Sequence, residues 1–179
     1  MSFTNPASAA SETGAAYTKA LLALLGDQDP FEVQEQLVPA LRAHVAAMDP
    51  SDLRRPEKPG KWSVLDVICH LADSELVYGY RLRMIVAEDE PALVGYDQDR
   101  WAGRLHHDTA DLDFELERLD LLRRSNLGFL RSLDSAEWDR VGRHSERGVE
   151  SVRRVFHLLA AHDLVHLRQI DRIRQSISR

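Results

Sequence analysis

Apolar residues recur every three or four positions along much of the chain, which is the spacing of amphipathic helices that bury one face. The clearest stretch runs from Arg154 to Arg174 without a glycine or a proline, and it predicts one long helix. Residues 63–90 predict a second, central helix, because their apolar positions surround much of its circumference. Further helices are predicted over residues 12–25, 40–48 and 111–132. No segment shows the period of two that is expected of a half-buried strand.

Proline, glycine and capping residues set the expected limits of these helices. Ser63, with Asp66 three residues later, is a variant of the capping box, so the central helix is expected to begin at Ser63. Gly79 interrupts this helix at a cost of about 1 kcal/mol relative to alanine, which predicts a close packing contact there. Pro39 lacks a backbone N–H, and we expect it to divide the earlier helix and leave only the part after it. Ser151 is a candidate N-cap for the last helix.

Four substantial helices joined by connections of very unequal length predict an all-α fold, a four-helix bundle with an extra short N-terminal helix. A chain of 179 residues can bury roughly two thirds of its unfolded surface, so residues 13–179 are expected to form a single domain. Residues 1–12 are small and polar, and they are expected to form a flexible N-terminus. Residues 91–109 and 139–151 have no clean period and are expected to be loops.

Composition excludes several classes of function. The formal net charge is −6 and no basic stripe stands out, so binding to nucleic acid has no electrostatic support. No stretch approaches the roughly 18 apolar residues of a membrane span, and the N-terminus lacks the basic start and apolar block of a secretory signal. We therefore expect a cytoplasmic protein that does not bind membranes. Cys69 is the single cysteine, which excludes an intrachain disulfide, and it is expected to be a small buried residue.

His162 and His166 lie one turn apart on the predicted last helix, about 40° from each other around its axis. Apolar residues fall on the same side of this helix, so both imidazoles are expected to face the core. A buried imidazole must satisfy both ring nitrogens by hydrogen bonding or bind something else, and two stacked on one face suggest a metal site. With eight histidines in the chain such a pair also arises by chance, so a third ligand from elsewhere is needed.

His70 lies near the middle of the predicted central helix, on a side that also carries polar residues. Facing helices of a bundle can direct metal ligands into its interior, where His70 would meet His162 and His166. Three imidazoles leave coordination positions open on Zn²⁺ or Ni²⁺, which is typical of sites that act on water or a substrate. The alternative is that His70 is a hydrogen-bonded core residue and that the pair is coincidental.

Several other residues are candidates for supporting roles. Asp66 and Asp73 lie on the same side of the helix as His70, and they are candidate acceptors for imidazole N–H groups. Asp163, about 100° from the histidine pair, is a weaker candidate. Tyr96 and Trp101 are candidates for the lip of a pocket, although aromatic residues in such segments also plug cores.

The remaining histidines fit a metal site poorly. His106 and His107 are adjacent and would point apart, so we expect them at the surface. His157 lies about 140° around the helix from His162 and cannot share its site directly. His144, in an expected loop between two glycines, can approach an end of the bundle and stays a minor candidate ligand.

Four separated blocks together resemble the DinB/YfiT-like superfamily: PGKWSVLDVICHLADSE at 59–75, YDQDRW at 96–101, GRHSERG at 142–148 and AAHDLVHLRQI at 160–170. The likeness covers roughly residues 35–175 in the same order. It implies a four-helix bundle, often a homodimer, in which one histidine of the second bundle helix and a His-x-x-x-His pair of the last helix bind nickel, zinc or a related ion. The residues that match this pattern are His70, His162 and His166.

The resemblance also implies a class of reaction. Members with assigned activities are S-transferases or isomerases that use low-molecular-weight thiols such as bacillithiol or mycothiol, and others are proposed metal-dependent hydrolases. We therefore expect a divalent metal ion, a small-molecule substrate and a nucleophile made available by a lowered pKa of bound water or thiol. No Ser-His-Asp or Cys-His arrangement is evident, and no general base is identifiable. The alternative is a non-catalytic, metal-stabilised dimeric binding or stress-response module.

Overall fold

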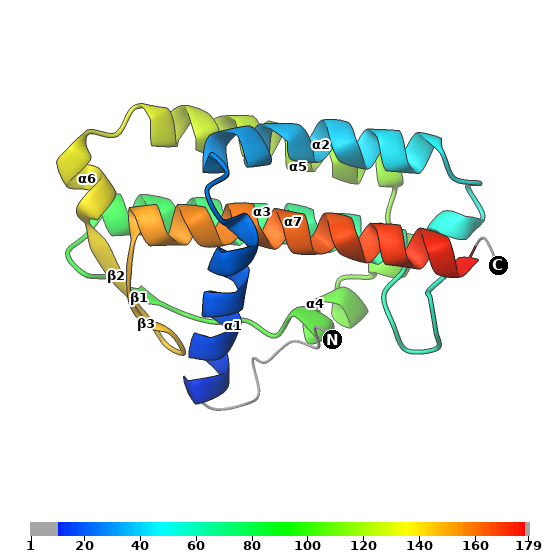
Figure 1. Ribbon diagram of the computed structural model, residues 1–179, viewed down its shortest axis with the longest axis horizontal. Coiled ribbons are helices and arrows are strands. Elements are labelled where there is room, and N and C mark those ends of the chain that lie inside the picture. The colour runs from blue at the N-terminus through cyan, green and yellow to red at the C-terminus, as the bar shows by residue number, and fades with distance from the viewer. Residues whose placement is uncertain (1–10, 178–179) are drawn as a thin grey trace.

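Four long helices lie side by side as a bundle in the computed structural model, which describes residues 11–177, with side chains from residue 16 onward (Figure 1). They are α2 (Pro30–Ala46), α3 (Val64–Ala87), α5 (Leu112–Arg131) and α7 (Val152–Ile177). Helices α2 and α3 each contact both α5 and α7, so in cross-section the four helices lie at the corners of a square. The predicted bundle is confirmed, and the long last helix extends along its whole length.

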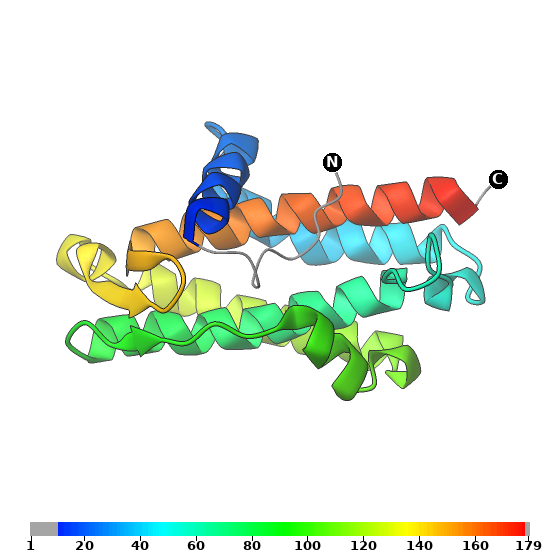
Figure 2. The ribbon, with the colours of Figure 1, turned by 90° about the horizontal axis from the view of Figure 1, so that it is seen from below.

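One long connection sets the order of the helices in the bundle. The colours in Figures 1 and 2 show that α2 and α7 run in one direction and that α3 and α5 run in the other. Because α3 and α5 are parallel neighbours, the chain must return along α3 before α5 begins. The returning segment contains β1 (Ala92–Leu93), α4 (Gln98–Arg104) and the 3₁₀ turn η3 (His107–Thr109), where the sequence predicted only a loop. It covers one side of α3 (Figure 2).

Local sequence signals explain where α3 begins and how closely it packs. The Asp66 backbone N–H donates to Ser63 Oγ at 3.2 Å, and the Ser63 backbone N–H donates to the Asp66 carboxylate at 2.8 Å, which is the predicted capping box. The close contact predicted at Gly79 is also confirmed, because a Cβ at this position would lie 2.5 Å from Asn126 Oδ1 of α5. Glycine therefore allows α3 and α5 to approach each other at this level.

Helix α2 runs without a break through Pro39, so the prediction that this proline divides the helix was wrong. Pro39 is exposed, whereas Leu37, Val38 and Leu41 beside it are buried against the other bundle helices. A proline inside a helix costs about 3 kcal/mol, and burying each of these side chains gains about 1.5–3 kcal/mol. Packing of the apolar face therefore outweighs the lost hydrogen bond on the solvent side.

A small sheet lies at the end of the bundle where α3 ends and α7 begins, and no strand had been predicted there. β1 pairs in parallel with β2 (Val141–His144), and β2 pairs antiparallel with β3 (Gly148–Ser151). The register places Leu93 of β1 opposite His144 of β2. Strands of two and four residues are too short to show a period of two in the sequence, which explains why they were missed.

Two shorter helices complete the fold. Figure 2 shows α1 (Ser11–Leu25) crossing α7, against which it packs. α6 (Ser135–Asp139) leads into the hairpin, and at the start of α7 the Arg154 N–H donates to Oγ of the predicted cap, Ser151, at 3.1 Å. Most of the predicted flexible N-terminus, residues 1–12, lies outside the described residues, and α1 already begins within it.

The core between the bundle helices consists mainly of leucine, isoleucine and valine side chains. Cys69 is buried among them, as predicted, and burial raises the pKa of its thiol to about 12. Within residues 11–177, no helix combines the length and the apolar character needed to cross a membrane.

Candidate metal centre

Three imidazole rings meet inside the bundle, between α3 and α7. His70 Nε2 lies 3.0 Å from His162 Nε2, and His166 Nε2 lies 3.1 Å from the same atom. His162 and His166 are one turn apart on α7, and all three side chains are buried. The structure therefore brings together the three histidines singled out from the sequence, and the atom of each ring that faces the others is Nε2.

The partner of His166 shows which of its ring nitrogens carries a lone pair. His166 Nδ1 lies 2.8 Å from Gln169 Oε1, an oxygen that can only accept, so Nδ1 carries the proton. In the neutral ring Nε2 is then unprotonated and directs its lone pair toward His162. All three Nε2 atoms are hydrogen-bonded only if His162 donates one N–H that is shared between His70 and His166. His162 Nδ1 is then a buried, unprotonated nitrogen without a hydrogen-bond partner. A shared cation is the alternative that uses the lone pairs of all three Nε2 atoms.

The separations between these nitrogen atoms fit a shared ion. Imidazole nitrogens bind Zn²⁺ at about 2.0–2.1 Å, which places two ligands about 2.9 Å apart at a right angle and about 3.4 Å apart in a tetrahedron. The observed 3.0 and 3.1 Å lie within this range. Nitrogen donors suit Zn²⁺ and Ni²⁺, whereas Mg²⁺ and Ca²⁺ prefer oxygen. The residues present therefore fit a divalent transition metal.

Burial keeps these imidazoles in the neutral form. Desolvation, followed by the neighbouring histidines, holds the pKa values of His70 and His162 well below the ordinary 6.5. For His166, burial lowers the pKa to about 4, against a raising effect of its hydrogen bond to Gln169. At neutral pH each of the three rings is therefore neutral, with one N–H and one lone pair, which is the state in which imidazole binds a metal.

We expect the metal-free protein to lose stability as the pH falls from about 6.5 toward 4. Over this range the unfolded chain takes up a proton at His166, whereas the folded protein resists protonation because the pKa of that residue is lowered to about 4. Linkage gives a loss of about 2 kcal/mol at pH 5 from this one residue. Urea unfolding of chelator-treated protein at pH 7 and pH 5 measures the effect. His166→Gln should show a smaller difference, and equal stability of the unsubstituted protein at both pH values would contradict the expectation.

Hydroxyl groups lie on one side of the three rings. Ser74 Oγ is 3.4 Å from His70 Nε2 and 3.0 Å from Tyr96 Oη. Tyr96 packs against Trp101, with ring centroids 4.5 Å apart. The two residues considered for a pocket lip therefore lie together on the returning segment, and Tyr96 reaches the metal centre through Ser74.

A cavity of about 740 Å³ opens beside His166. Trp62 lines it, and its ring is nearly parallel to that of His166, at an angle of 17° and a centroid distance of 6.4 Å. Gln169 and Tyr17 also line it, so the cavity extends from the metal centre to α1. Its volume is within the range of about 300–1,000 Å³ that is typical of small-molecule sites.

The two aspartates considered as supports for the metal ligands have other partners. The Asp66 carboxylate accepts hydrogen bonds from the backbone and hydroxyl of Ser63. Asp73 lies 3.0 Å from His107 Nε2 and accepts a hydrogen bond from Arg118 at 2.9 Å. Both carboxylates are paired with donors outside the group of three rings.

The expectation that His107 lies at the surface was wrong, because its side chain is buried and paired with Asp73. His106 before it adopts a left-handed conformation, with φ of 57°, and is exposed. The turn therefore leaves one of the two adjacent histidines exposed and buries the other.

A fully buried charge network lies behind His162 and joins three bundle helices. Arg123 of α5 donates to Asp163 of α7 at 2.5 and 3.1 Å, and it pairs with Glu75 of α3 at 2.9 Å. The Asp163 carboxylate is therefore taken up by Arg123 and not by an imidazole. Burial raises the pKa of Asp163 to about 6 in spite of the guanidinium.

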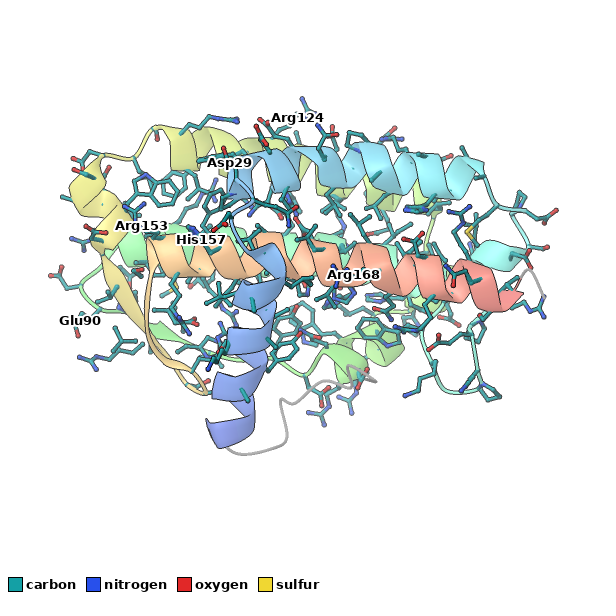
Figure 3. All side chains as sticks on the ribbon, viewed as in Figure 1. Asp29, Glu90, Arg124, Arg153, His157 and Arg168 are labelled. Atoms are coloured by element: carbon teal, nitrogen blue, oxygen red, sulfur yellow. The ribbon has the colours of Figure 1, made fainter. Side chains whose placement is uncertain are left out.

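Two further histidines have contacts of their own. His144 of β2 is buried, and its Nδ1 accepts the Glu146 backbone N–H at 3.1 Å. His157 Nδ1 lies 2.7 Å from the carbonyl oxygen of Arg153, and Figure 3 shows both residues near the start of α7. Within the described part of the chain, neither belongs to a group of potential metal ligands.

Comparison with known proteins assigns the family. The family model described as the DinB superfamily matches residues 35–170, which include all three clustered histidines. The chain belongs to the DinB superfamily. A family member from Oceanobacillus iheyensis, named "putative metal-dependent hydrolase", is 29% identical over 136 residues, covering 76% of this chain and 78% of that protein. YfiT of Bacillus subtilis, which carries the same name, is 27% identical over 146 residues, covering 79% and 82% of the two chains.

A similar solved structure supports the fold. It is described as "YfiT from Bacillus subtilis is a probable metal-dependent hydrolase with an unusual four-helix bundle topology". The two structures superpose with a TM-score of 0.77 at 26% identity, covering 83% of this chain and 86% of the other. The DinB-type bundle suggested by the sequence resemblance is therefore confirmed.

Sequence reasoning missed two residues of the site. Gln169 lies three residues after His166, which is the spacing of an intrahelical hydrogen bond between side chains. Trp62 stands just before Ser63, the cap of α3. Nothing in its spacing indicates that the ring turns back over His70, at a centroid distance of 4.8 Å.

Proposed function

We propose that the protein is a metal-dependent enzyme that binds Zn²⁺ or Ni²⁺ through Nε2 of His70, His162 and His166 and acts on a small electrophilic substrate. The reaction is either hydrolysis or the transfer of a low-molecular-weight thiol. The observation that carries the proposal is the convergence of three buried Nε2 atoms, with His162 Nε2 at 3.0 Å from His70 Nε2 and at 3.1 Å from His166 Nε2. The names of the relatives from Oceanobacillus and Bacillus support metal dependence and hydrolysis.

An ion held by three imidazoles keeps coordination positions open and lowers the pKa of a bound water or thiol, which makes a nucleophile available near neutral pH. The side chains of the protein orient the metal ligands and offer hydrogen bonds beside them. Gln169 fixes the ring of His166 in the ligating tautomer, and the hydroxyls of Ser74 and Tyr96 offer hydrogen bonds beside His70. Cys69 cannot serve as the thiol, because it is buried and its pKa is raised to about 12.

Two assays on metal-loaded protein separate hydrolysis from thiol transfer. The first assay follows hydrolysis of 4-nitrophenyl acetate without added thiol. The second follows the conjugation of monochlorobimane with each thiol of a panel containing bacillithiol, mycothiol, glutathione and cysteine. Turnover in the first assay alone favours a hydrolase, and turnover that requires one thiol favours a transferase. Metal-dependent binding without turnover in either assay would contradict the proposed activity.

Removal of the metal is expected to lower the unfolding temperature. An ion that binds only the folded state stabilises it by about 2.7 kcal/mol when its free concentration is 100 times the dissociation constant. Untagged protein should therefore unfold at a lower temperature after treatment with a chelator, and added Zn²⁺ or Ni²⁺ should raise the unfolding temperature to its original value. Mg²⁺ is the control and should leave the unfolding temperature low, because the site offers nitrogen donors. An unchanged unfolding temperature would contradict metal binding at this site.

The second candidate is a dimeric, metal-stabilised module without catalytic activity. It is favoured by exposed apolar side chains on one face of α3, where Leu76 and Tyr80 lie one turn apart and are 49% and 64% exposed. A second copy of the chain is the partner that this alternative requires. Light scattering measures the mass in solution, and Leu76→Asp should yield monomers if this face forms the dimer. A stable dimer without turnover of any thiol or ester would favour the module over the enzyme.

A further inference from the structure

Arg81 of α3 is a buried cation without a carboxylate partner. Its side chain is 5% exposed, and its guanidinium donates to the carbonyl oxygen of Val94. No carboxylate of the described residues forms an ion pair with it, whereas most of the other arginines inside the protein have one. Burial lowers the pKa of Arg81, which is the expected sign for a cation that has lost water without gaining a counter-charge. A guanidinium in this position is expensive unless an anion binds to it.

His144 carries an unsatisfied, buried N–H donor. Its Nδ1 accepts the backbone N–H of Glu146, so the neutral ring carries its proton on Nε2. This nitrogen is buried and has no hydrogen-bond partner. His144 is 4% exposed, and burial, followed by the positive charges of Arg147 and Arg81, lowers its pKa to about 4, so the ring is neutral at pH 7. A buried N–H donor without an acceptor is rare in folded proteins.

The register of the sheet places His144 beside Arg81. Gly142, two residues earlier on β2, faces α3, because a Cβ at that position would lie 3.0 Å from Ile85 Cγ1. Side chains two residues apart on a strand share a face, so His144 also faces α3. Arg81 is one helical turn before Ile85. The carbonyl group that Arg81 contacts belongs to Val94, the residue that follows the register partner of His144.

The nearby carboxylate of Glu150 is paired with arginines other than Arg81. Arg147 donates two hydrogen bonds to the fully buried Glu150, both at 2.8 Å, and Arg154 lies 3.9 Å from the same carboxylate. Among the described residues, Glu150 is the carboxylate whose charge raises the pKa of Arg81 and of His144. With Glu150 neutralised by Arg147, the charge of Arg81 remains uncompensated.

The two donors lie next to the candidate metal centre. The Arg81 guanidinium is 5.6 Å from the centroid of the Tyr78 ring, and this ring is 6.5 Å from the ring of His162. Tyr78 therefore lies between His162 and Arg81, and a molecule with one end at the three rings would need to pass this ring to reach Arg81.

We propose that Arg81 and His144 form a binding site for a carboxylate, or a similar singly charged oxyanion, of the substrate whose reactive end lies at the three histidines. The guanidinium supplies charge and paired donors, and His144 Nε2–H supplies one more hydrogen bond. The single unpaired guanidinium of Arg81 matches a monoanion better than a phosphate dianion. This inference rests on the proposed function for the identity of the reacting group, but binding of the carboxylate itself does not require the metal.

The test measures binding in metal-free protein, because a carboxylate would also coordinate a metal ion. Three matched pairs of probes are titrated by calorimetry: acetate and acetamide, butyrate and butyramide, benzoate and benzamide. We expect at least one carboxylate to bind about 10- to 100-fold more tightly than its neutral amide. Arg81→Met, which keeps the length of the side chain, should remove this preference. Inorganic phosphate binding more tightly than every carboxylate would overturn the assignment to a monoanion.

Matched variants separate a binding role from a structural one. Arg124→Met removes an exposed arginine of α5 and should leave the preference unchanged (Figure 3). Arg81→Lys keeps the charge and should retain a weaker preference, which preserves the test if Arg81→Met does not fold. His144→Gln retains a side-chain N–H and should bind the carboxylate more tightly than His144→Phe does. Arg81→Met should also raise the unfolding temperature, since it removes an unpaired buried charge.

Two results would overturn the inference. One is the absence of any carboxylate preference in the unsubstituted protein, and the other is an equal preference in Arg81→Met. Neither result bears on the proposed function, which is assayed separately with metal-loaded protein. Conversely, carboxylate binding that depends on Arg81 in a protein without hydrolase or transferase activity would support this site and contradict the proposed reaction.

Discussion

Replacing His162 by alanine is expected to abolish stoichiometric binding of Zn²⁺ or Ni²⁺. His162 Nε2 is the atom that lies within 3.1 Å of both other ring nitrogens, so its loss leaves two donors on different helices, His70 of α3 and His166 of α7. We expect the affinity to fall by at least about 100-fold, and any metal-dependent turnover to disappear with it. Elemental analysis of untagged, dialysed protein measures the effect. His70→Ala is expected to behave in the same way.

His157→Ala is the matched control for this variant. His157 lies on the same helix but bonds to the backbone at Arg153, so its removal should leave a full equivalent of metal. His107→Ala is a poorer control than the sequence suggested, because this ring is buried against Asp73. A full equivalent of metal in His162→Ala would contradict the three-histidine site.

Replacing Arg123 by leucine is expected to cost about 3–5 kcal/mol of unfolding free energy at pH 7. Asp163 and Glu75 are both fully buried, and each would lose the guanidinium that now neutralises it. Water cannot reach these carboxylates unless the bundle opens, so the cost is one of uncompensated charge. Urea unfolding of the metal-free protein measures the difference without a contribution from the ion.

The neighbouring residue provides the control for Arg123. Arg124 is exposed and pairs with Asp120 one turn away on the solvent side, so Arg124→Leu should change the stability by less than about 1 kcal/mol. Lowering the pH should return part of the loss in Arg123→Leu, because a protonated Asp163 carries no charge. A loss below about 1 kcal/mol in Arg123→Leu would mean that the network contributes little to folding.

Periodicity and capping were sufficient to predict most of the bundle. The long last helix, the start of α3 at Ser63 and the close contact at Gly79 all depend on local spacing or on single residues with strong conformational preferences. The approach of His70 to His162 and His166 was inferred from helical faces together with the family resemblance, and the structure brings these rings together. The identity of the metal and the chemistry remain predictions.

The features that the sequence did not predict depend on tertiary contacts, which a single sequence does not display. The helix continues through Pro39 because its inner face packs well, and the sheet forms because the returning segment lies beside the hairpin. His107 is buried because Asp73, far away in the sequence, provides its partner. The hydrogen bond between Gln169 and His166 becomes visible only when the orientation of the imidazole ring is known.

The position of the three histidines along the chain has a consequence for the life of the protein in the cell. His70 and His162 are 92 residues apart, and His166 follows His162 by four residues. The ribosome must therefore translate α7 before the second and third ligands exist. Under the proposed function, loading of the ion follows synthesis, and the supply of Zn²⁺ or Ni²⁺ at that moment determines which metal the finished protein carries.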